Sequence, residues 1–422
     1  MNVLIKSATV VNANSPLNGK KVDILIEKGI IQKIASSIKN TNNYKEVTHK
    51  DLHVSAGWID MRANFCDPGH EFKEDLNSGL DAAAKGGFTE VVSMPDTLPV
   101  VDSKSGIEYV INKTKDNIVT VYPTGALSQN CEGKEISEMY DMHLAGAIAF
   151  TDNKHSISNP SLLNRALLYS QSFGGLIMDF PNDKNLFNNG QINEGIISTK
   201  LGLKGAPALA EELTVTRSLY LAEYCNAPIH LTNISTKKSV QLIKEAKAKG
   251  LKVTADVNSY HLLLNENELE TFDSNLKVKP PLRTKDDNKA LIRGLKDGTL
   301  DAVCSDHTPE DIENKQCEFD NTTFGMINLQ TSFSALNTAL NGKINLDEFI
   351  ETITTKPRTI LKVTQPQLKE GELANLTLFS PSTEFVFEKA QIISKAKNSP
   401  FVGRTLKGTV IGIINKNKVK LV

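Results

Sequence analysis

Cysteine is scarce in this sequence, and its spacing excludes two kinds of stabilising site. Five cysteines occur among 422 residues, and no two of them form a Cys-x-x-Cys pair. They are Cys66, Cys131, Cys225, Cys304 and Cys317. An odd number at wide spacing fits neither a disulfide framework nor a thiolate zinc site. We therefore expect reduced thiols in the interior of a cytoplasmic protein.

Long apolar runs, an excess of either charge and glycine-rich phosphate loops are also missing. No apolar stretch approaches the ~18 residues of a membrane-spanning helix, and the first residues read as a strand rather than a signal peptide. Lys and Arg number 48 against 49 Asp and Glu, so the net charge is -1. Such a chain has no general attraction for nucleic acid or an anionic membrane. The missing Walker and dinucleotide loops argue against nucleotide enzymes of those classes.

The two ends of the chain have the pattern of short strands. Hydrophobic residues make up 40% of the chain, which is enough for a sizeable core. The length fits two or three domains, or one large barrel with a smaller domain beside it. Strands are expected at 3–5, 22–26, 30–34, 376–379, 409–414 and 419–422. Neither end is large enough to build a good core alone. We predict that residues 1–53 and 362–422 pair into one small β domain.

Between the ends, short apolar strands alternate with helical segments. The expected strands are 58–61, 89–94, 119–122, 147–150, 175–178, 228–231, 251–257 and 300–304. The clearest helices are 207–224 and 236–249, the second with Ser235 as a possible N-cap. Eight strand–helix units predict an α/β fold, a (β/α)8 TIM barrel over residues 54–361, whose functional residues follow the strands. An open doubly wound sheet is the alternative.

Many of the segments that follow these strands resemble the dihydroorotases of the cyclic amidohydrolase family. The matching segments are VSAGWID (54–60), DPG (67–69), KED (73–75), AAAKGGFT (82–89), MPDT (94–97), GAPA (205–208), VTADV (253–257), KPPLR (279–283) and SDH (305–307). The resemblance implies a (β/α)8 barrel beside a small β-sandwich formed by both chain ends. Typical members use zinc to close carbamoyl-aspartate reversibly into dihydroorotate, in pyrimidine biosynthesis.

The metal-ligand positions implied by this resemblance are changed. The family motif Asp-x-His-x-His after the first barrel strand reads Asp60-Met61-Arg62-Ala63-Asn64 here, and none of the four ligand histidines remains. The other changed or retained positions are Asp152, Asn153, Asp179 and Asn233. A guanidinium has no lone pair to offer a metal. We expect no bound metal or other cofactor, and Asp306, the family's general base, is then vestigial.

The substrate-binding positions implied by the resemblance also differ from the residues that the family has there. Cys66 stands where the family has arginine, Asp96 and Lys279 stand where it has asparagine, and Glu310 replaces a histidine. A dianionic substrate would meet a thiol and a carboxylate, which is the wrong sign of charge.

Two readings of the remaining carboxylates stay open. In one, Asp60, Asp152, Asp179 and Asp306 form a hard-oxygen site for Mg2+ or Mn2+. In the other, which we favour, Arg62 fills the former metal position and pairs with at least one carboxylate from Asp152, Asp179 and Asp306.

A few other side chains have a catalytic and a structural interpretation. His230, His261 and His307 lie at strand ends and are the remaining acid–base candidates, although hydrogen bonding is the favoured role for each. Cys66 near Arg62 is a possible nucleophile, but a packed thiol is the simpler interpretation. Arg283 either binds an anion or holds the Pro280-Pro281 loop.

Three functions are consistent with this pattern. The favoured one is a dihydroorotase-like pseudoenzyme, because ligand positions changed while the glycines and prolines of the frame remain. Non-catalytic chains of this family are structural partners of aspartate carbamoyltransferase, so the resemblance implies that partner, and we also expect a homo-oligomer. The alternatives are an active dihydroorotase with substituted ligands and a different hydrolase with a remodelled pocket.

Overall fold

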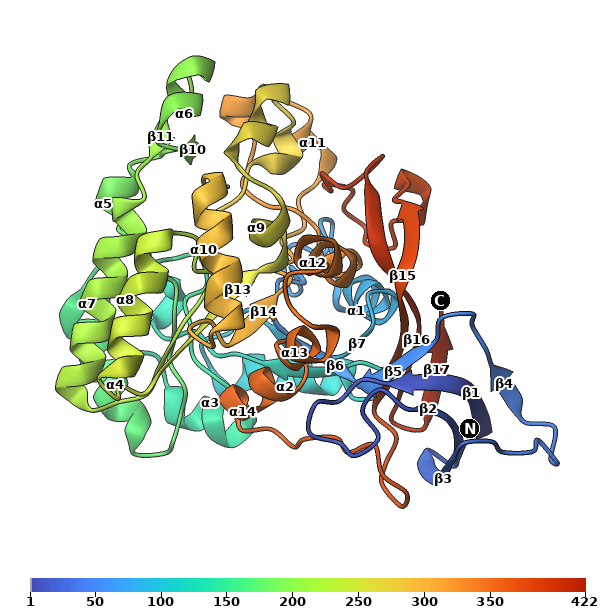
Figure 1. Ribbon diagram of the computed structural model, residues 1–422. Coiled ribbons are helices and arrows are strands. Elements are labelled where there is room, and N and C mark those ends of the chain that lie inside the picture. Colours follow the sequence, from blue (N-terminus) through green and yellow to red (C-terminus); the bar gives the residue numbers. More distant parts are fainter. Residues whose placement is uncertain (1) are drawn as a thin grey trace.

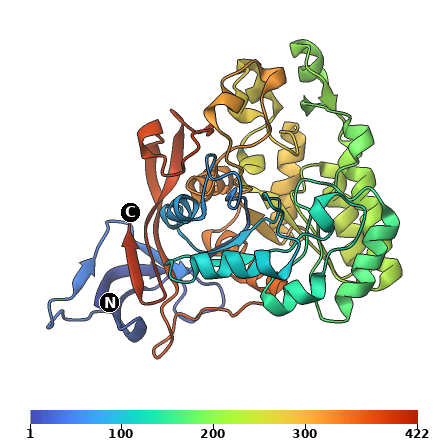
Figure 2. The same ribbon diagram turned by 180° about the vertical axis from the view of Figure 1, so that it is seen from behind.

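Both ends of the chain contribute to a single eight-stranded sheet. The computed structural model describes residues 2–422, and in this sheet the strand order is β17-β16-β15-β5-β1-β2-β3, with β4 paired to β1. The strands are β1 (Asn2–Val10), β2 (Lys21–Glu27), β3 (Ile30–Ala35), β4 (Lys45–Val47), β5 (His53–Ala56), β15 (Leu376–Val386), β16 (Thr405–Asn415) and β17 (Lys418–Leu421). Both termini lie on the same side of the molecule (Figures 1 and 2).

The two chain ends meet where β5 pairs with β15. The pairing is antiparallel, with Leu376 opposite Ala56 and Leu378 opposite Val54. Val54, Leu376 and Leu378 join Ile24 and Ile414 in one buried apolar cluster. This burial couples segments more than 300 residues apart, as expected for a small sheet that lacks a core of its own at either end. The positions of the domain boundaries remain a prediction.

The middle of the chain forms a closed parallel barrel. Its strands are β6 (Trp58–Ala63), β7 (Phe88–Ser93), β8 (Thr120–Pro123), β9 (Met178–Asp179), β12 (Ile229–Leu231), β13 (Val253–Asn258) and β14 (Ala302–Cys304), and residues 147–150 take the fourth place through isolated bridges at Phe150. A parallel bridge between Ala63 and His307 closes the ring. The predicted (β/α)8 barrel is therefore confirmed, and the open sheet is wrong.

The chain forms helices around the barrel and beyond its mouth (Figure 1). They are α1 (Leu76–Lys85), α2 (Lys104–Thr114), α3 (Met139–Ala145), α4 (Pro160–Gln171), α5 (Lys184–Phe187), α6 (Ile196–Leu201), α7 (Leu209–Cys225), α8 (Lys237–Ala248), α9 (Ser259–Leu263), α10 (Lys285–Lys296), α11 (Ile312–Lys315), α12 (Ser332–Leu340), α13 (Leu346–Glu351) and α14 (Thr355–Leu361). Two further short strands, β10 (Ile192–Asn193) and β11 (Gly205–Ala206), pair beside α6. In Figure 1, α4, α7 and α8 lie on the side of the barrel opposite the small sheet.

One helix cap differs from its prediction. The cap of α8 is Thr236, whose hydroxyl accepts from the Ser239 amide, and not Ser235. The Ser235 amide and hydroxyl instead donate to the Glu211 carboxylate, which tethers α7 to the end of β12. Among residues 2–422, no helix is long and apolar enough to cross a membrane.

Candidate functional site

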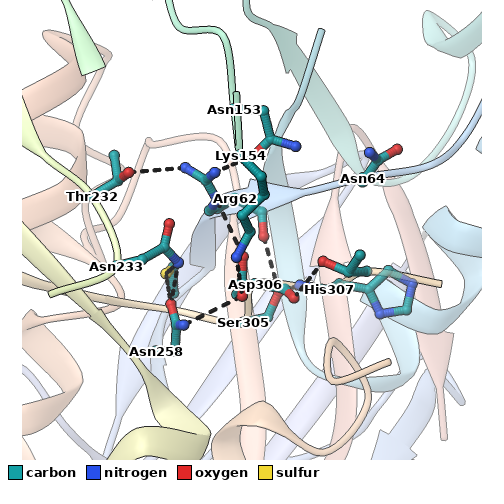
Figure 3. A network of polar contacts seen from close by, with 12 residues as sticks. Arg62, Asn64, Asn153, Lys154, Thr232, Asn233, Asn258, Ser305, Asp306 and His307 are labelled. Carbon is teal, nitrogen blue, oxygen red and sulfur yellow. Dashed lines mark hydrogen bonds and ion pairs between the residues drawn. The ribbon is translucent and has the colours of Figure 1, made fainter. Parts of the chain in front are cut away.

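Arg62 lies at the centre of the site, at the carboxyl end of β6. Its side chain is 1% exposed and points into the barrel mouth (Figure 3). Nε donates to the Asp306 carboxylate at 3.1 Å, one terminal nitrogen donates to the Thr232 hydroxyl at 3.0 Å, and the other donates to the Asn153 amide oxygen. These partners follow three other barrel strands. The predicted pairing of Arg62 with at least one rim carboxylate is confirmed for Asp306.

The Asp306 carboxylate is fully engaged by donors. In addition to Arg62, it accepts from the Lys154 ammonium at 2.7 Å, the Tyr260 hydroxyl at 2.6 Å and the Asn258 amide at 3.3 Å. It is 4% exposed. A general base must hold a lone pair towards a water or substrate proton. In this arrangement the acceptor sites of Asp306 are directed at protein donors instead.

The other three rim aspartates are partnered with hydroxyl groups, and among the described residues none of them bonds the Arg62 guanidinium. Asp60 meets Arg62 only at its backbone amide. Asp60 accepts from the Ser305 amide at 2.6 Å and the Ser305 hydroxyl at 2.7 Å. Asp152 accepts from the amide and hydroxyl of Ser128, and Asp179 accepts from the Ser218 hydroxyl at 2.6 Å. Burial raises the pKa of all three carboxyls, and that of Asp60 to about 7. The four aspartates therefore do not converge as a hard-oxygen ligand set.

The three asparagines at the family's ligand positions take part in side-chain hydrogen bonds. Asn64 donates to Asp96 at 3.0 Å, and Asp96 also accepts from the Asn153 amide at 2.6 Å. Asn233 donates to the Asn258 side-chain oxygen. Within residues 2–422, no group of three or more His, Cys, Asp and Glu side chains is placed to hold a metal ion. Structural and catalytic zinc sites need such donors, and Arg62 brings a fixed positive charge among them, so these residues do not fit zinc.

The four changed substrate positions meet in one cavity above this network, which we call the mouth cavity. It has a volume of about 400 Å³ and is lined by Cys66, Asp96, Lys279 and Glu310. It also receives Lys73, whose ammonium lies 2.9 Å from the Glu310 carboxylate, and Lys154. These lysines face the carboxylates of Asp96 and Glu310 across the cavity wall. The cavity wall carries charge of both signs, so the expectation of a wrong-sign site is not supported by its geometry.

Cys66 does not have the surroundings of a reactive thiol. It is 6% exposed, and burial together with the neighbouring carboxylates of Asp96 and Glu310 raises its pKa far above the usual range, against the opposing effect of Lys73. Nucleophilic cysteines need a depressed pKa. The packed-thiol interpretation agrees with this environment.

The three candidate histidines are buried and hydrogen-bonded. His230 lies between the Thr254 hydroxyl at 2.8 Å and the Asp256 carboxylate at 3.0 Å, and the His307 Nδ1 accepts from the Asn328 amide at 3.1 Å. His261 Nε2 contacts the Pro281 carbonyl at 3.1 Å, and burial lowers its pKa to about 4. None of them lines the mouth cavity, where the histidines are instead His70 and His155.

The Arg283 side chain bonds other protein groups and does not line the mouth cavity. Its guanidinium is 4% exposed and donates to Ser235, to the Asn193 side chain and to the Ala206 carbonyl. Its ion-pair partner is Glu211, at 3.9 Å. Within residues 2–422 its side chain makes no hydrogen bond to the Pro280-Pro281 loop, so its structural contacts are to other segments than the predicted one.

Sequence reasoning missed Lys154 and Tyr260, both of which donate to Asp306. Lys154 directly follows the Asp152-Asn153 pair in the sequence. Like Arg62, it is a cationic residue at or beside a ligand position of the family, and this signal could have identified it. Tyr260 sits in the first turn of α9 and gave no comparable signal.

Comparisons with known proteins agree with this architecture. The model of the family "Dihydro-orotase-like" matches residues 53–239. The chain is 37% identical to a dihydroorotase of Geobacter metallireducens over 421 residues, which cover 99% of each chain. It is 40% identical to a dihydroorotase of Ruminiclostridium cellulolyticum over 419 residues, covering 98% of this chain and 97% of the relative.

Solved structures show the same fold at lower identity. An L-hydantoinase (dihydropyrimidinase) from Arthrobacter aurescens superposes with a TM-score of 0.84 at 19% identity, covering 100% of this chain and 97% of that one. A dihydropyrimidinase from Brevibacillus agri gives a TM-score of 0.82 at 20% identity. At this identity the likeness concerns the fold alone. Identity over nearly the full length to the two dihydroorotases, together with the barrel and its mouth, shows that this chain belongs to the dihydroorotase family.

Proposed function

We propose that this chain is a dihydroorotase-like protein of pyrimidine biosynthesis that does not catalyse the family reaction and acts as a structural or regulatory subunit. The observation that carries the proposal is the ion pair between Arg62 and Asp306. It puts a permanent cation at a former ligand position and engages the former general base. A divalent ion would have to displace both Arg62 and Lys154 from that carboxylate.

The missing Lewis acid sets the expected rate. A bound zinc ion lowers the pKa of water from ~16 to ~7 and polarises the scissile carbonyl. Without it, neither effect is available to an amide substrate. A general base contributes only ~10²–10⁴-fold, and Asp306 is held by four donors. We therefore expect this chain to hydrolyse dihydroorotate only at the background rate.

An active dihydroorotase with substituted ligands is the second candidate. What favours it is the name shared by the relatives, which are 36–40% identical to this chain across nearly its full length. The two candidates differ in one measurable quantity, the turnover of dihydroorotate and carbamoyl-aspartate by the purified chain.

The test is an assay in both directions with and without added Zn2+, beside the Asp306→Asn variant. The proposal expects the same background rate for both proteins under every condition. Turnover by the unmodified chain that Asp306→Asn removes would establish the second candidate instead. The matched substitution keeps the size of the side chain, and circular dichroism checks that the variant is folded.

For the partner we propose aspartate carbamoyltransferase, on the basis of the family resemblance. A non-catalytic subunit needs a contact surface, and α7 supports this role with exposed apolar side chains at Leu213 (50% exposed), Tyr220 (70%) and Tyr224 (75%). Such side chains are typical of interaction sites when they lie together. Sedimentation of the mixed proteins should show a joint species that Tyr220→Glu weakens. Two independently sedimenting proteins would refute the partnership and leave the catalytic question untouched.

A further inference from the structure

A second and larger cavity adjoins the mouth cavity, and lysines dominate its wall. We call it the lysine cavity, because it is lined by Lys134, Lys154, Lys184, Lys277 and Lys279. Its volume is about 820 Å³, within the ~300–1,000 Å³ typical of small-molecule sites. The two cavities share Lys154, His155, Lys279 and Phe324. The loops that form the lysine cavity come from five separate parts of the chain.

The carboxylates of the lysine cavity do not balance its lysines. Among the residues that line the cavity, only Glu132 and Asp320 carry carboxylates, and Glu132 is already paired with Lys134 at 2.8 Å. Lys154 is paired with Asp306 at 2.7 Å, which leaves Asp320 to face Lys184, Lys277 and Lys279. The Lys277 ammonium donates to the backbone carbonyls of Phe319 and Asp320, at 2.8 and 3.0 Å. A carbonyl is a dipole and does not cancel a charge. Positive charge therefore remains in excess on this wall.

Lys279 shows the same imbalance at the junction of the two cavities. Its ammonium donates to the Lys154 carbonyl at 3.1 Å, and within residues 2–422 no carboxylate oxygen lies within ion-pair distance of it. Burial, followed by repulsion from Lys154 and Lys184, lowers its pKa to about 8. Such a depression is expected where a desolvated cation has no counter-ion.

Three cations also surround the ring of Phe180. The distances to the ring centroid are 5.8 Å from Arg62 Cζ, 5.3 Å from Lys154 Nζ and 5.6 Å from Lys279 Nζ. The Asp306 carboxylate forms ion pairs with both Arg62 and Lys154, so two of the three positive charges share one negative charge. A cation–π contact offsets only part of the cost of crowding like charges.

We propose that the lysine cavity binds a small anion with two or more negative charges, such as a phosphate ester or a polycarboxylate. Ammonium groups act as point-charge binders of phosphate and carboxylate oxygens. Lys184, Lys277 and Lys279 line the cavity and supply the attraction. The rings of Phe187 and Phe324, with centroids 6.0 Å apart, give it an apolar wall for the uncharged part of such a molecule. The proposal concerns binding and is independent of whether the barrel mouth is active.

The test is calorimetric titration of the full chain with pyrophosphate and, separately, with citrate. Binding of at least one is expected, weakening steeply as NaCl is raised because screening acts on charge. Lys184→Met should lower the affinity about threefold or more and Lys279→Met about tenfold or more. Lys184 is exposed and lines only the lysine cavity, so its variant is expected to fold normally. The matched controls are Lys33→Met, on the exposed edge strand β3, and Lys73→Met, which lines only the mouth cavity.

Each outcome decides the proposal. Tighter binding of pyrophosphate than of citrate assigns the site to phosphate esters, and the reverse assigns it to polycarboxylates. Absence of binding of both anions at millimolar concentration would overturn the proposal. Affinity unchanged by Lys184→Met and Lys279→Met, or lost equally in Lys73→Met, would also overturn it, because the anion would then bind elsewhere. A failed dihydroorotase assay changes none of these readouts.

Discussion

The side chains of Lys154 and Lys279 each donate a hydrogen bond to the other's backbone carbonyl oxygen. This reciprocal pair joins the loop after the fourth barrel strand to the loop before Pro280, although the two residues are 125 positions apart. It fixes both ammonium groups near Phe180 and brings one of them to Asp306. The same contact thus organises the network at the barrel mouth and the junction with the lysine cavity.

The first prediction concerns metal. Protein purified without added metal should contain far less than one zinc per chain, because Arg62, Asn64, Asp179 and Asn233 stand at the positions of the family's histidines. Elemental analysis after exhaustive dialysis measures this directly. Stoichiometric zinc bound at the barrel mouth, located by anomalous scattering, would show that the donor set fits after all.

The second prediction concerns the stability contributed by Arg62. Arg62→Met should lower the free energy of unfolding towards the lower part of the ~3–5 kcal/mol range for breaking a buried pair, since Lys154 still neutralises Asp306. Urea denaturation measures the change, and the exposed Arg293→Met on α10 is the control. Arg62→Lys should lose less, because it retains charge without the guanidinium fork. An Arg62→Met protein as stable as the unmodified chain would contradict the role of the network.

The third prediction concerns acid. The pKa of His261 is about 4 in the folded chain against 6.5 for an ordinary histidine, so the unfolded state binds more protons between these values. Stability from this group is therefore present above pH ~6.5 and lost as the pH falls towards ~4, by about 3 kcal/mol in total.

The measurement for His261 is a difference between two proteins. The raised pKa of Asp60 acts in the opposite direction over part of this range, because the folded state then holds the extra proton and loses stability as pH rises. Urea midpoints of the unmodified chain and His261→Gln should thus be compared at each pH. Parallel curves for the two proteins would show that folding does not shift the pKa of His261.

The fourth prediction concerns thiol reactivity. Cys317 is exposed while the other four cysteines are buried, and burial raises the pKa of Cys66. Iodoacetamide at mildly alkaline pH should modify Cys317 first, and Cys66 only on unfolding. Peptide mass spectrometry over time gives the order. Cys66 labelling as fast as Cys317 would point to an activated thiol in the mouth cavity.

Some features of this molecule follow from local sequence alone. The alternation of short apolar strands with helical segments predicts the barrel, because each buried strand must be covered by its helix. The position of Arg62 at the carboxyl end of β6 predicts that it enters the mouth, since side chains at the carboxyl ends of barrel strands converge there. A buried cation needs a negatively charged partner, which predicts that Arg62 pairs with a carboxylate at the barrel rim. In the structure this carboxylate is Asp306.

Other features were decided only when distant segments packed together. Asp152 and Asp179 face Ser128 and Ser218 rather than Arg62, and no local pattern determines which hydroxyl a buried carboxylate meets. The lysine cavity likewise brings Lys184, at the start of α5, together with Lys277 and Lys279, which lie in a loop more than 90 residues later in the chain. Strand periodicity arises from backbone geometry within a few residues, whereas the partners of a charge depend on which loops close over the barrel.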